Sequence, residues 1–430
     1  MRTLTLNERV TLLKSFVNGG RFLKQSPYWA PERMRDWQFA RIQKLVTHAM
    51  KEIPFYRAHY GAASFELGDL KSWDDFHRLP LVTKDDVIQH FPEGMLKKGA
   101  NLDDLIVSRS SGSSGKVLDV CYDSQAMITF MLAGLRLYRM GFRYGPLHRQ
   151  LYIYTSPYPL SSVFGLFPMH FVSTLEEVDK IAAKIEAIRP ELLVCYPSHL
   201  KQIAPLLSKR ATSRLRCISV NSEMSTQAER DAISERWGCP VLDEYSSEEL
   251  TRIAAQCTCG KYHVFEDINY METLPPEPGS NLGVLVGTQL HNFAMPMIRY
   301  VQNDLGELQS SVCDCGWRFR QLINLQGRKN DSFLMPSGRE ISSGFLLDAT
   351  YDILLEWREA VLDFCLIQTG GDQVKLQVVK GSGWSDRIAE EIKQRFNGYF
   401  KNEVRFWIEG VEICEKTRSG KRNPILRRIK

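Results

Sequence analysis

The 430-residue sequence contains no apolar run that approaches the roughly 20 residues a membrane-spanning helix needs. Its longest apolar stretch, near residues 127–135, is interrupted by Thr129 and Gly134. The N-terminal segment places Glu8 and Arg9 where a secretion signal would be apolar. These absences predict a cytoplasmic protein without a membrane partner.

An excess of one charge is also missing from most of the chain. The net charge is +5, and the last sixteen residues hold seven basic side chains and one acidic one, so the remainder is close to neutral. Proteins that bind nucleic acid in bulk usually show a wider basic surface, so we expect no nucleic-acid partner. The composition, 43% hydrophobic and 24% charged, is typical of a globular protein with room for two or three domains.

The sequence does contain a short segment of serine and glycine, SSGSSGK, at residues 110–116. Strand-like sequence flanks it on both sides, which predicts a loop between two strands. Such a loop offers backbone N–H groups and hydroxyls with little steric bulk, as close approach to a polyphosphate requires. It lacks the Walker spacing, because only two residues separate Gly112 from Gly115 and Val117 follows the lysine. A phosphate-binding loop and an ordinary flexible connector both remain open.

From residue 105 onward, strand-like and helix-like stretches alternate. This alternation predicts an α/β fold with a mostly parallel sheet and helices on both of its faces. In such sheets, ligands lie beyond the carboxyl ends of the strands. Turns follow predicted strands at Asn221 and Tyr245, so we expect these turns and the serine-glycine loop to converge on one site.

The two ends of the chain differ from this pattern. The first hundred residues are predicted to be mainly helical, because apolar residues in them recur at helical spacing. After Arg328, the sequence predicts a hairpin within residues 361–380, then a helix and one more strand. We therefore predict a large N-terminal domain, residues 1–327, and a small, mobile C-terminal α+β domain, residues 328–430.

Two adjacent carboxylates, Glu248 and Glu249, come directly after the predicted strand that ends near Tyr245. Acidic pairs of this kind commonly mark the solvated start of a helix. A carboxylate that faces a phosphate loop could instead hold Mg²⁺ against nucleotide oxygens. The spacing of the residues leaves both interpretations open.

Ten cysteines are present, and six of them lie singly in apolar or strand-like surroundings that are typical of buried thiols. The other four form two Cys-x-Cys pairs, Cys257 with Cys259 and Cys313 with Cys315. Together with His263 they give five candidates for the four positions around a tetrahedral zinc ion. Reduced thiols without a metal are the alternative.

Several segments match motifs of a known family, in the same order along the chain. They are SSGSSG at 110–115, YSSEE at 245–249, PMIRYVQNDLGEL around Asp304, GRKND at 327–331 and KTRSGK at 416–421. The N-terminal segments VTHAMKEIPFYRAHY and LPLVTKDDV are similar as well. The chain resembles the adenylate-forming (ANL) superfamily, and within it the phenylacetate-CoA ligase-like branch that includes proteins encoded in capsular-polysaccharide loci.

The resemblance implies an ATP-dependent ligase that works in two steps. A carboxylate attacks the α-phosphate of ATP, with Mg²⁺ bound, to give acyl-AMP and pyrophosphate. A thiol, commonly that of coenzyme A (CoA), then takes the acyl group. The small domain would rotate about Asn330 between the two steps.

The resemblance also assigns roles to individual residues. Glu249 would hold Mg²⁺, and Lys421 would contact the α-phosphate and the carboxylate during adenylation. The ATP site would comprise Ser110, Ser111, Gly112, Ser113, Ser114, Gly115, Ser222, Glu223, Tyr245, Ser246, Asp304 and Arg328. An aryl or arylacetic acid would occupy a pocket bordered by Tyr154, Tyr158, Phe164, Tyr196 and Asn221.

For the metal, members of this branch have a Cys, a His about six residues later and a later Cys-x-Cys-Gly. By resemblance, this pattern favours Cys257, His263, Cys313 and Cys315 over Cys259. Four protein ligands leave no position for an activated water, so such a zinc ion would be structural.

The sequence departs from the family pattern at three places. Lys116 comes one residue early after the phosphate loop, Ser246 replaces the usual glycine, and Asn330 stands where the hinge is normally Asp or Lys. These departures keep open a catalytically degenerate, zinc-stabilised binding protein. The resemblance itself leaves a second alternative, a synthetase that passes acyl-AMP directly to an amine or hydroxyl, as some relatives do. A homodimer is also left open.

Overall fold

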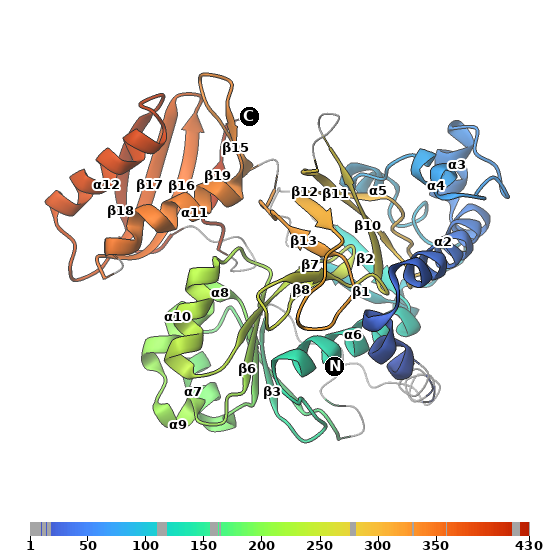
Figure 1. Cartoon of the computed structure of the whole chain (residues 1–430), viewed down its shortest axis with the longest axis horizontal. Coiled ribbons are helices and arrows are strands. Elements are labelled where there is room, and N and C mark those ends of the chain that lie inside the picture. The colour runs from blue at the N-terminus through green and yellow to red at the C-terminus, as the bar shows by residue number, and fades with distance from the viewer. Residues whose placement is uncertain are drawn as a thin grey trace.

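The computed structural model describes residues 10, 14, 19–109, 118–154, 162, 165–275, 281–328, 331–357, 359–414 and 422–429. An 11-stranded sheet forms the centre of the larger part of the molecule, and a 4-stranded sheet forms the smaller part (Figure 1). We call the smaller sheet and the elements packed around it, within residues 331–429, the C-terminal unit.

Helices form the N-terminal part of the chain, as the sequence predicts. They are α2 (Pro31–Glu52), α3 (Pro54–Ala62), α4 (Trp73–Arg78) and α5 (Lys84–His90). Thr83 caps α5, because its side chain accepts a hydrogen bond from the main chain of Asp86 while the Asp86 side chain accepts one in return. The Tyr56 hydroxyl donates to Pro296 O at 2.8 Å and so attaches α3 to the loop before β12 (Tyr300–Gln309).

The large sheet has the strand order β10-β11-β12-β13-β9-β8-β7-β6-β5-β3-β4. Its other strands are β3 (Gln150–Tyr154), β4 (Met169–Ser173), β5 (Leu192–Cys195), β6 (Cys217–Asn221), β7 (Val241–Ser247), β8 (Thr251–Gln256), β9 (Tyr262–Val264), β10 (Asn269–Leu274), β11 (Gly283–Gln289) and β13 (Gln321–Ile323). Strands β4, β3, β5, β6 and β7 pair in parallel, and each remaining pair is antiparallel.

The prediction of a mostly parallel sheet is therefore correct for the half from β3 to β7 and wrong for the other half. Parallel strands need a long crossover, which the helices between β4 and β7 supply. Beyond β7, short connections join most successive strands, and such connections suit antiparallel pairing. The sheet is mixed.

Helices cover both faces of the parallel half, where neighbouring residues of a strand point to opposite sides. In β5, Leu192 and Val194 join the core that includes α6 (Ser124–Gly141), whereas Leu193 and Cys195 join the core on the other face. That second face is covered by α7 (Val178–Ile188) and α8 (Pro197–Ile203), with α9 (Lys209–Thr212) and α10 (Gln227–Trp237) nearby (Figure 1). Burial on both faces explains why these strands are apolar throughout.

The C-terminal unit has its own apolar core, built around Phe364, Leu376 and Phe396. Its strands are β16 (Val361–Gly370), β17 (Gln373–Lys380), β18 (Arg405–Val411) and β19 (Ile425–Arg427), with α11 (Ser343–Leu354), α12 (Asp386–Tyr399) and the ribbon β14 (Phe333–Leu334) and β15 (Glu340–Ile341). The predicted hairpin is the antiparallel pair β16 and β17. Short 3-10 turns in the chain are η1 (Ser26–Tyr28), η2 (Leu102–Asp104), η3 (Ala204–Leu206) and η5 (Leu355–Trp357).

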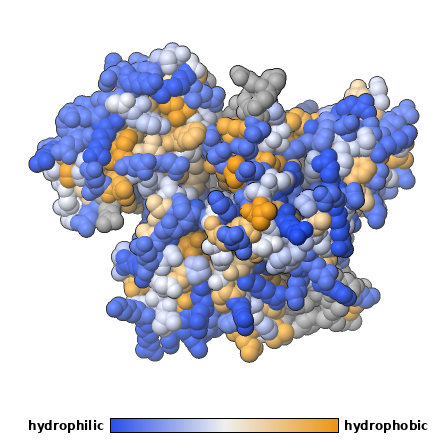
Figure 2. All heavy atoms as spheres, in the orientation of Figure 1, coloured by the Kyte–Doolittle hydropathy of each residue, from blue (hydrophilic) through white to orange (hydrophobic). Residues whose placement is uncertain are grey.

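Hydrophilic residues dominate the face of the molecule drawn in Figure 2, and hydrophobic residues form small patches between them. In the part of the chain that the structure describes, no helix combines the length and the apolar character needed to cross a membrane.

A buried ion pair joins the N-terminal segment, α6 and the large sheet. The Arg136 guanidinium donates to both carboxylate oxygens of Asp267, at 2.6 and 2.9 Å, and Ser26 donates to the same carboxylate. Arg136 also lies over the ring of Phe265, with its Cζ 4.4 Å from the ring centroid. The Asp267 side chain has no exposed surface, so its charge depends on this pairing.

We expect the substitution Arg136→Met to lower the free energy of unfolding by about 3–5 kcal/mol, because it leaves the Asp267 carboxylate buried and unpaired. Urea titration of the purified variant measures this loss. The matched substitution Arg387→Met breaks the exposed Arg387–Glu391 pair on α12 and should leave the unfolding midpoint unchanged. Equal midpoints for the Arg136 variant and the wild type would contradict this role of the ion pair.

Candidate functional site

The strands on either side of the serine-glycine segment form a hairpin. β1 (Ile106–Arg109) pairs antiparallel with β2 (Asp119–Tyr122). The hairpin is attached to the turn after β7, because Ser108 Oγ donates to Glu248 Oε2 at 2.5 Å and the Tyr122 hydroxyl donates to Glu248 O. The predicted phosphate-binding residues Ser110, Ser111, Gly112, Ser113, Ser114 and Gly115 lie outside the described residues.

Glu248 and Glu249 lie in the turn between β7 and β8, so the alternative of a solvated helix start is wrong. Glu249 is 8% exposed, and its Oε1 accepts a hydrogen bond from the Tyr300 hydroxyl at 3.0 Å. A buried carboxylate held next to the stem of the hairpin is in a suitable place to hold a divalent cation.

Tyr245 and Asp304 meet across the large sheet. The Tyr245 hydroxyl donates to Asp304 Oδ2 at 2.5 Å, and Asp304 forms an isolated antiparallel bridge with Arg328. Burial raises the pKa of Asp304 above its ordinary value, and the charge of Arg328 opposes this shift only in part. Ser246 lies beside Tyr245 in β7, because this strand continues to Ser247 instead of turning at Tyr245 as predicted.

The carboxyl ends of β3, β5 and β6 bring a second group of predicted residues together. The hydroxyls of Tyr154 and Ser222 are 2.5 Å apart, and Ser222 Oγ donates to Asn221 Oδ1 at 3.0 Å. The rings of Tyr154 and Tyr196 meet edge to face, with their centroids 4.9 Å apart. These residues therefore lie together at one edge of the sheet, whereas Tyr158 and Phe164 lie outside the described part of the chain.

Glu223 connects this edge of the sheet to the C-terminal unit. Its carboxylate accepts hydrogen bonds from the Ser198 main chain and hydroxyl, both at 3.0 Å, and from the main-chain N–H of Arg422 at 2.5 Å. Burial raises the pKa of Glu223, although these hydrogen bonds oppose the shift. Lys421, the predicted catalytic lysine, lies outside the described residues, but Arg422 follows it directly in the sequence.

Three residues of the candidate site have left-handed backbone conformations that side chains with a Cβ rarely adopt. They are Ser222 (φ 67°), Thr251 (φ 57°) and Asn303 (φ 63°), next to Asn221, the Glu249 turn and Asp304 respectively. Strained positions of this kind persist where the surrounding structure holds them, and they are frequent at functional sites.

The sequence reasoning did not single out four residues that hold the site together. Ser108, Tyr122 and Ser198 carry no motif signal, because they act only through partners distant in sequence. Tyr300 could have been found, since it lies inside the segment MIRYVQND that the resemblance uses.

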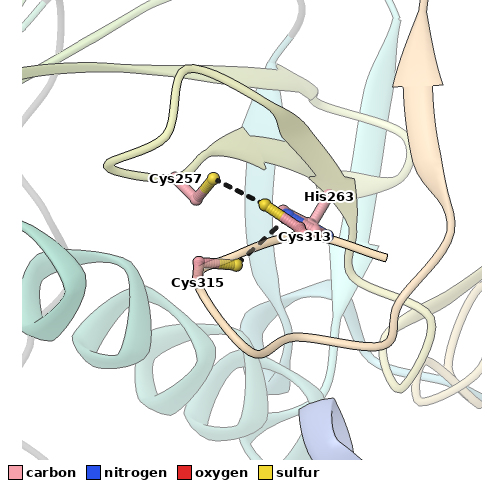
Figure 3. A group of neighbouring side chains, drawn as sticks. All are labelled: Cys257, His263, Cys313 and Cys315. Carbon is pink, nitrogen blue, oxygen red and sulfur yellow. Dashed lines mark hydrogen bonds between the residues drawn. The ribbon is translucent and has the colours of Figure 1, made fainter. Parts of the chain in front are cut away.

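A separate cluster of cysteine and histidine side chains lies at the side of the large sheet (Figure 3). Cys257 follows β8, His263 lies in β9, and Cys313 and Cys315 lie in the connection between β12 and β13. Their ligand atoms all lie within 4.8 Å of one another, and Figure 3 shows the four side chains pointing inward. Cys259 is exposed and is not a member of the cluster.

The distances within the cluster fit a tetrahedral zinc ion. Zn–S bonds of about 2.3 Å and Zn–N bonds of about 2.0 Å place ligand atoms roughly 3.5–3.8 Å apart. Cys257 Sγ lies 3.7 Å from Cys313 Sγ, and Cys315 Sγ lies 3.4 Å from His263 Nε2. His263 Nδ1 donates to Phe319 O at 3.2 Å, which leaves Nε2 free to bind a metal.

We expect the purified chain to carry about one zinc ion, and Cys313→Ser to lose it and to unfold at a lower temperature, because a structural zinc contributes directly to folding. Elemental analysis and thermal unfolding measure the two effects. Cys259→Ser is the matched control, since it removes a neighbouring thiol outside the cluster and should keep the metal. A wild-type chain that folds without any metal would contradict the assignment.

No family model matches the sequence. The chain is 27% identical over 322 residues to a phenylacetate-coenzyme A ligase of Thermus thermophilus, covering 71% of this chain and 72% of the relative. It is 21% identical over 372 residues to protein CapK of Staphylococcus aureus, covering 83% of this chain and 81% of CapK.

Among solved structures, the fold is similar to that of 2-hydroxyisobutyryl-CoA ligase in the postadenylation state with 2-HIB-AMP. The TM-score is 0.78 at 19% identity, and the match covers 94% of this chain and 91% of that chain. Against the same enzyme in the thioesterification state, the covered shares are the same but the TM-score is 0.62. Because the covered shares are equal, the difference between the two TM-scores reflects how the parts of the ligase are arranged in its two states. Phenylacetate-coenzyme A ligases and CapK are therefore distant homologues of this chain, and its fold is similar to that of ANL adenylate-forming ligases.

Proposed function

We propose that this chain uses ATP to convert a carboxylic acid into acyl-AMP and then transfers the acyl group to CoA. The observation that carries the proposal is the meeting of the hairpin stem, the Glu249 turn, the Tyr245–Asp304 pair and the Tyr154–Ser222 pair. Groups suited to a divalent cation, a ribose and a small acid would thereby be available beside the stem of the hairpin. The homologous phenylacetate-coenzyme A ligases support the same reaction class.

In the first step, a carboxylate oxygen of the acid bonds to the α-phosphorus of ATP while the bond to the β-phosphate oxygen breaks, releasing pyrophosphate. In the second step, the CoA sulfur bonds to the acyl carbon and AMP leaves. We assign Glu249 to Mg²⁺, which would neutralise phosphate charge in the first step. Asp304 and Arg328 are assigned to the ribose side of the nucleotide.

The other predicted residues of the ATP site are assigned to the remaining parts of the nucleotide. Ser110, Ser111, Gly112, Ser113, Ser114 and Gly115 would surround the β- and γ-phosphates, with Ser222, Glu223, Tyr245 and Ser246 along the rest of the nucleotide. Residues 1–327 would form the large domain and residues 328–430 the small domain that brings Lys421 to the site. The separate apolar cores of the two parts support this division.

We propose an aryl or arylacetic acid as the substrate. The edge-to-face pair of Tyr154 and Tyr196 beside Asn221 supports an aromatic pocket, which Tyr158 and Phe164 would complete. Zinc bound by Cys257, His263, Cys313 and Cys315 would stabilise the β8–β9 and β12–β13 connections and take no part in the reaction.

Pyrophosphate release from ATP and Mg²⁺ should appear with one class of acid and should increase when CoA is present. The measurement uses a panel of aryl, arylacetic, fatty and amino acids, each with and without CoA. Release that an amine or hydroxyl acceptor increases, but CoA does not, would identify an amide- or ester-forming synthetase instead. Silence across the panel from folded, zinc-loaded protein would contradict an adenylating enzyme and favour a degenerate binding protein.

Replacing Lys421 with alanine should slow adenylation by about 100-fold or more, because a positive charge at the developing negative centre is lost. ATP binding and the unfolding temperature should stay close to the wild-type values. Lys393→Ala, which removes a half-exposed lysine on α12, is the matched control and should leave the rate unchanged. Normal adenylation by the Lys421 variant would show that the C-terminal motif is wrongly assigned.

A further inference from the structure

A group of polar side chains joins the C-terminal unit to the helices of the large sheet. Tyr351 on α11 accepts a hydrogen bond from Lys201 Nζ at 2.8 Å and donates one to Glu229, and Lys201 and Glu229 form an ion pair. Lys201 lies on α8 and Glu229 on α10, the helices that face α11 in Figure 1. We call Lys201, Glu229 and Tyr351 the Tyr351 network.

The network continues to Arg422, which is held from both parts of the molecule. Arg422 donates to the Tyr351 hydroxyl at 3.2 Å and to Phe364 O at 3.2 Å, and its Nε lies 2.8 Å from Asp363 Oδ1. Its main-chain N–H donates to Glu223, which follows β6 of the large sheet. The C-terminal unit therefore fixes the side chain of Arg422, while the large sheet fixes its main chain.

The charges of the network are complementary. Burial opposes ionisation of Glu229, yet the neighbouring Lys201 and Arg422 hold its pKa below the ordinary value. Burial also opposes the charge of Lys201, but Tyr351 and Glu229 raise the pKa of its amine above the ordinary value. Both groups are therefore ionised near neutral pH, and Tyr351 is hydrogen-bonded to charged partners, which strengthens its bonds.

The position of the network connects it to the proposed reaction cycle. Arg422 is the residue after Lys421, so whatever fixes Arg422 limits the reach of the proposed catalytic lysine. The chain also superposes better on 2-hydroxyisobutyryl-CoA ligase in its postadenylation state, with a TM-score of 0.78, than in its thioesterification state, with 0.62. The contacts of the network thus belong to an arrangement that resembles the state reached by the first step.

We propose that Lys201, Glu229 and Tyr351 are positioning residues that hold the C-terminal unit, through Arg422, in the arrangement that serves adenylation. The proposal rests on the proposed function for the identity of the two steps, but the contact itself exists without substrate. In this proposal the network opens for transfer to the acceptor, because the lower TM-score against the thioesterification state indicates a different arrangement of the parts of the chain in that state. The network therefore sets the balance between the two steps.

Tyr351→Phe tests the proposal, because it removes the hydroxyl that all three charged partners share and keeps the ring. Hydrogen–deuterium exchange of the zinc-loaded, full-length protein should rise on the order of tenfold in peptides from α8 and α11, since hydrogen bonds to charged groups are lost. The matched variant Tyr28→Phe changes a tyrosine of η1 that is 55% exposed, and it should leave exchange in these peptides unchanged. Lys201→Met, at a side chain that is 33% exposed, should reproduce the effect of Tyr351→Phe.

The rates of the two half-reactions distinguish a positioning role from a merely structural one, because loss of a structural contact would slow both. Tyr351→Phe should slow pyrophosphate release on the order of tenfold, while acyl transfer from supplied acyl-AMP to CoA stays equal or becomes faster. The double variant Lys201→Met, Tyr351→Phe should lose less activity in pyrophosphate release than the two single losses predict together, because each substitution removes the same Lys201–Tyr351 contact.

Unchanged exchange in α8 and α11 in the Tyr351 and Lys201 variants would overturn the proposal, whatever the activity. Faster exchange with equal slowing of both half-reactions would also overturn the proposal. The residues would then stabilise the fold without favouring the arrangement for adenylation over the arrangement for transfer. If no acid gives pyrophosphate release in the wild type, the proposed function fails, and the exchange experiment still decides whether the Tyr351 network holds the C-terminal unit in place.

Discussion

Parallel pairing of β3, β5, β6 and β7 is the constraint on which the rest of the structure depends. Because the strands run in one direction, their carboxyl ends meet at one edge and bring Tyr154, Ser222 and Tyr245 together. The apolar residues on both faces of these strands keep that edge rigid. The hairpin of β1 and β2 and the C-terminal unit are then attached to this edge by polar contacts with Glu248 and Glu223.

The polar contacts at the edge differ in kind from the contacts in the cores. Apolar burial is strong but does not depend on direction, whereas hydrogen bonds to carboxylates fix one geometry. The carboxylates of Glu248 and Glu249 act in this way, since the first accepts a hydrogen bond from Ser108 in the stem of the hairpin and the second accepts one from Tyr300 of β12. The cysteine-histidine cluster likewise brings together the β8–β9 and β12–β13 connections.

The contact of the C-terminal unit with the larger part relies on ionised and hydroxyl groups around Tyr351 and Arg422. A contact of this composition can be exchanged for hydration when the unit moves, whereas a large apolar interface would resist opening. The unit keeps its own core around Phe364, so its internal packing does not depend on the contact. This combination is suited to a chain that uses more than one arrangement.

The sequence by itself determined the local elements, because caps and periodic apolar residues act over a few positions: Thr83 begins a helix, and the hairpin of β16 and β17 forms where alternation predicts it. Ordered motifs also carried the resemblance to adenylate-forming ligases, and that resemblance predicted the membership of Cys257 and His263 in one cluster. Only the tertiary structure decided the antiparallel half of the sheet, the burial of Glu249 and the engagement of Glu223 by Arg422. These features join residues that are far apart in the chain, and no local pattern encodes such pairings.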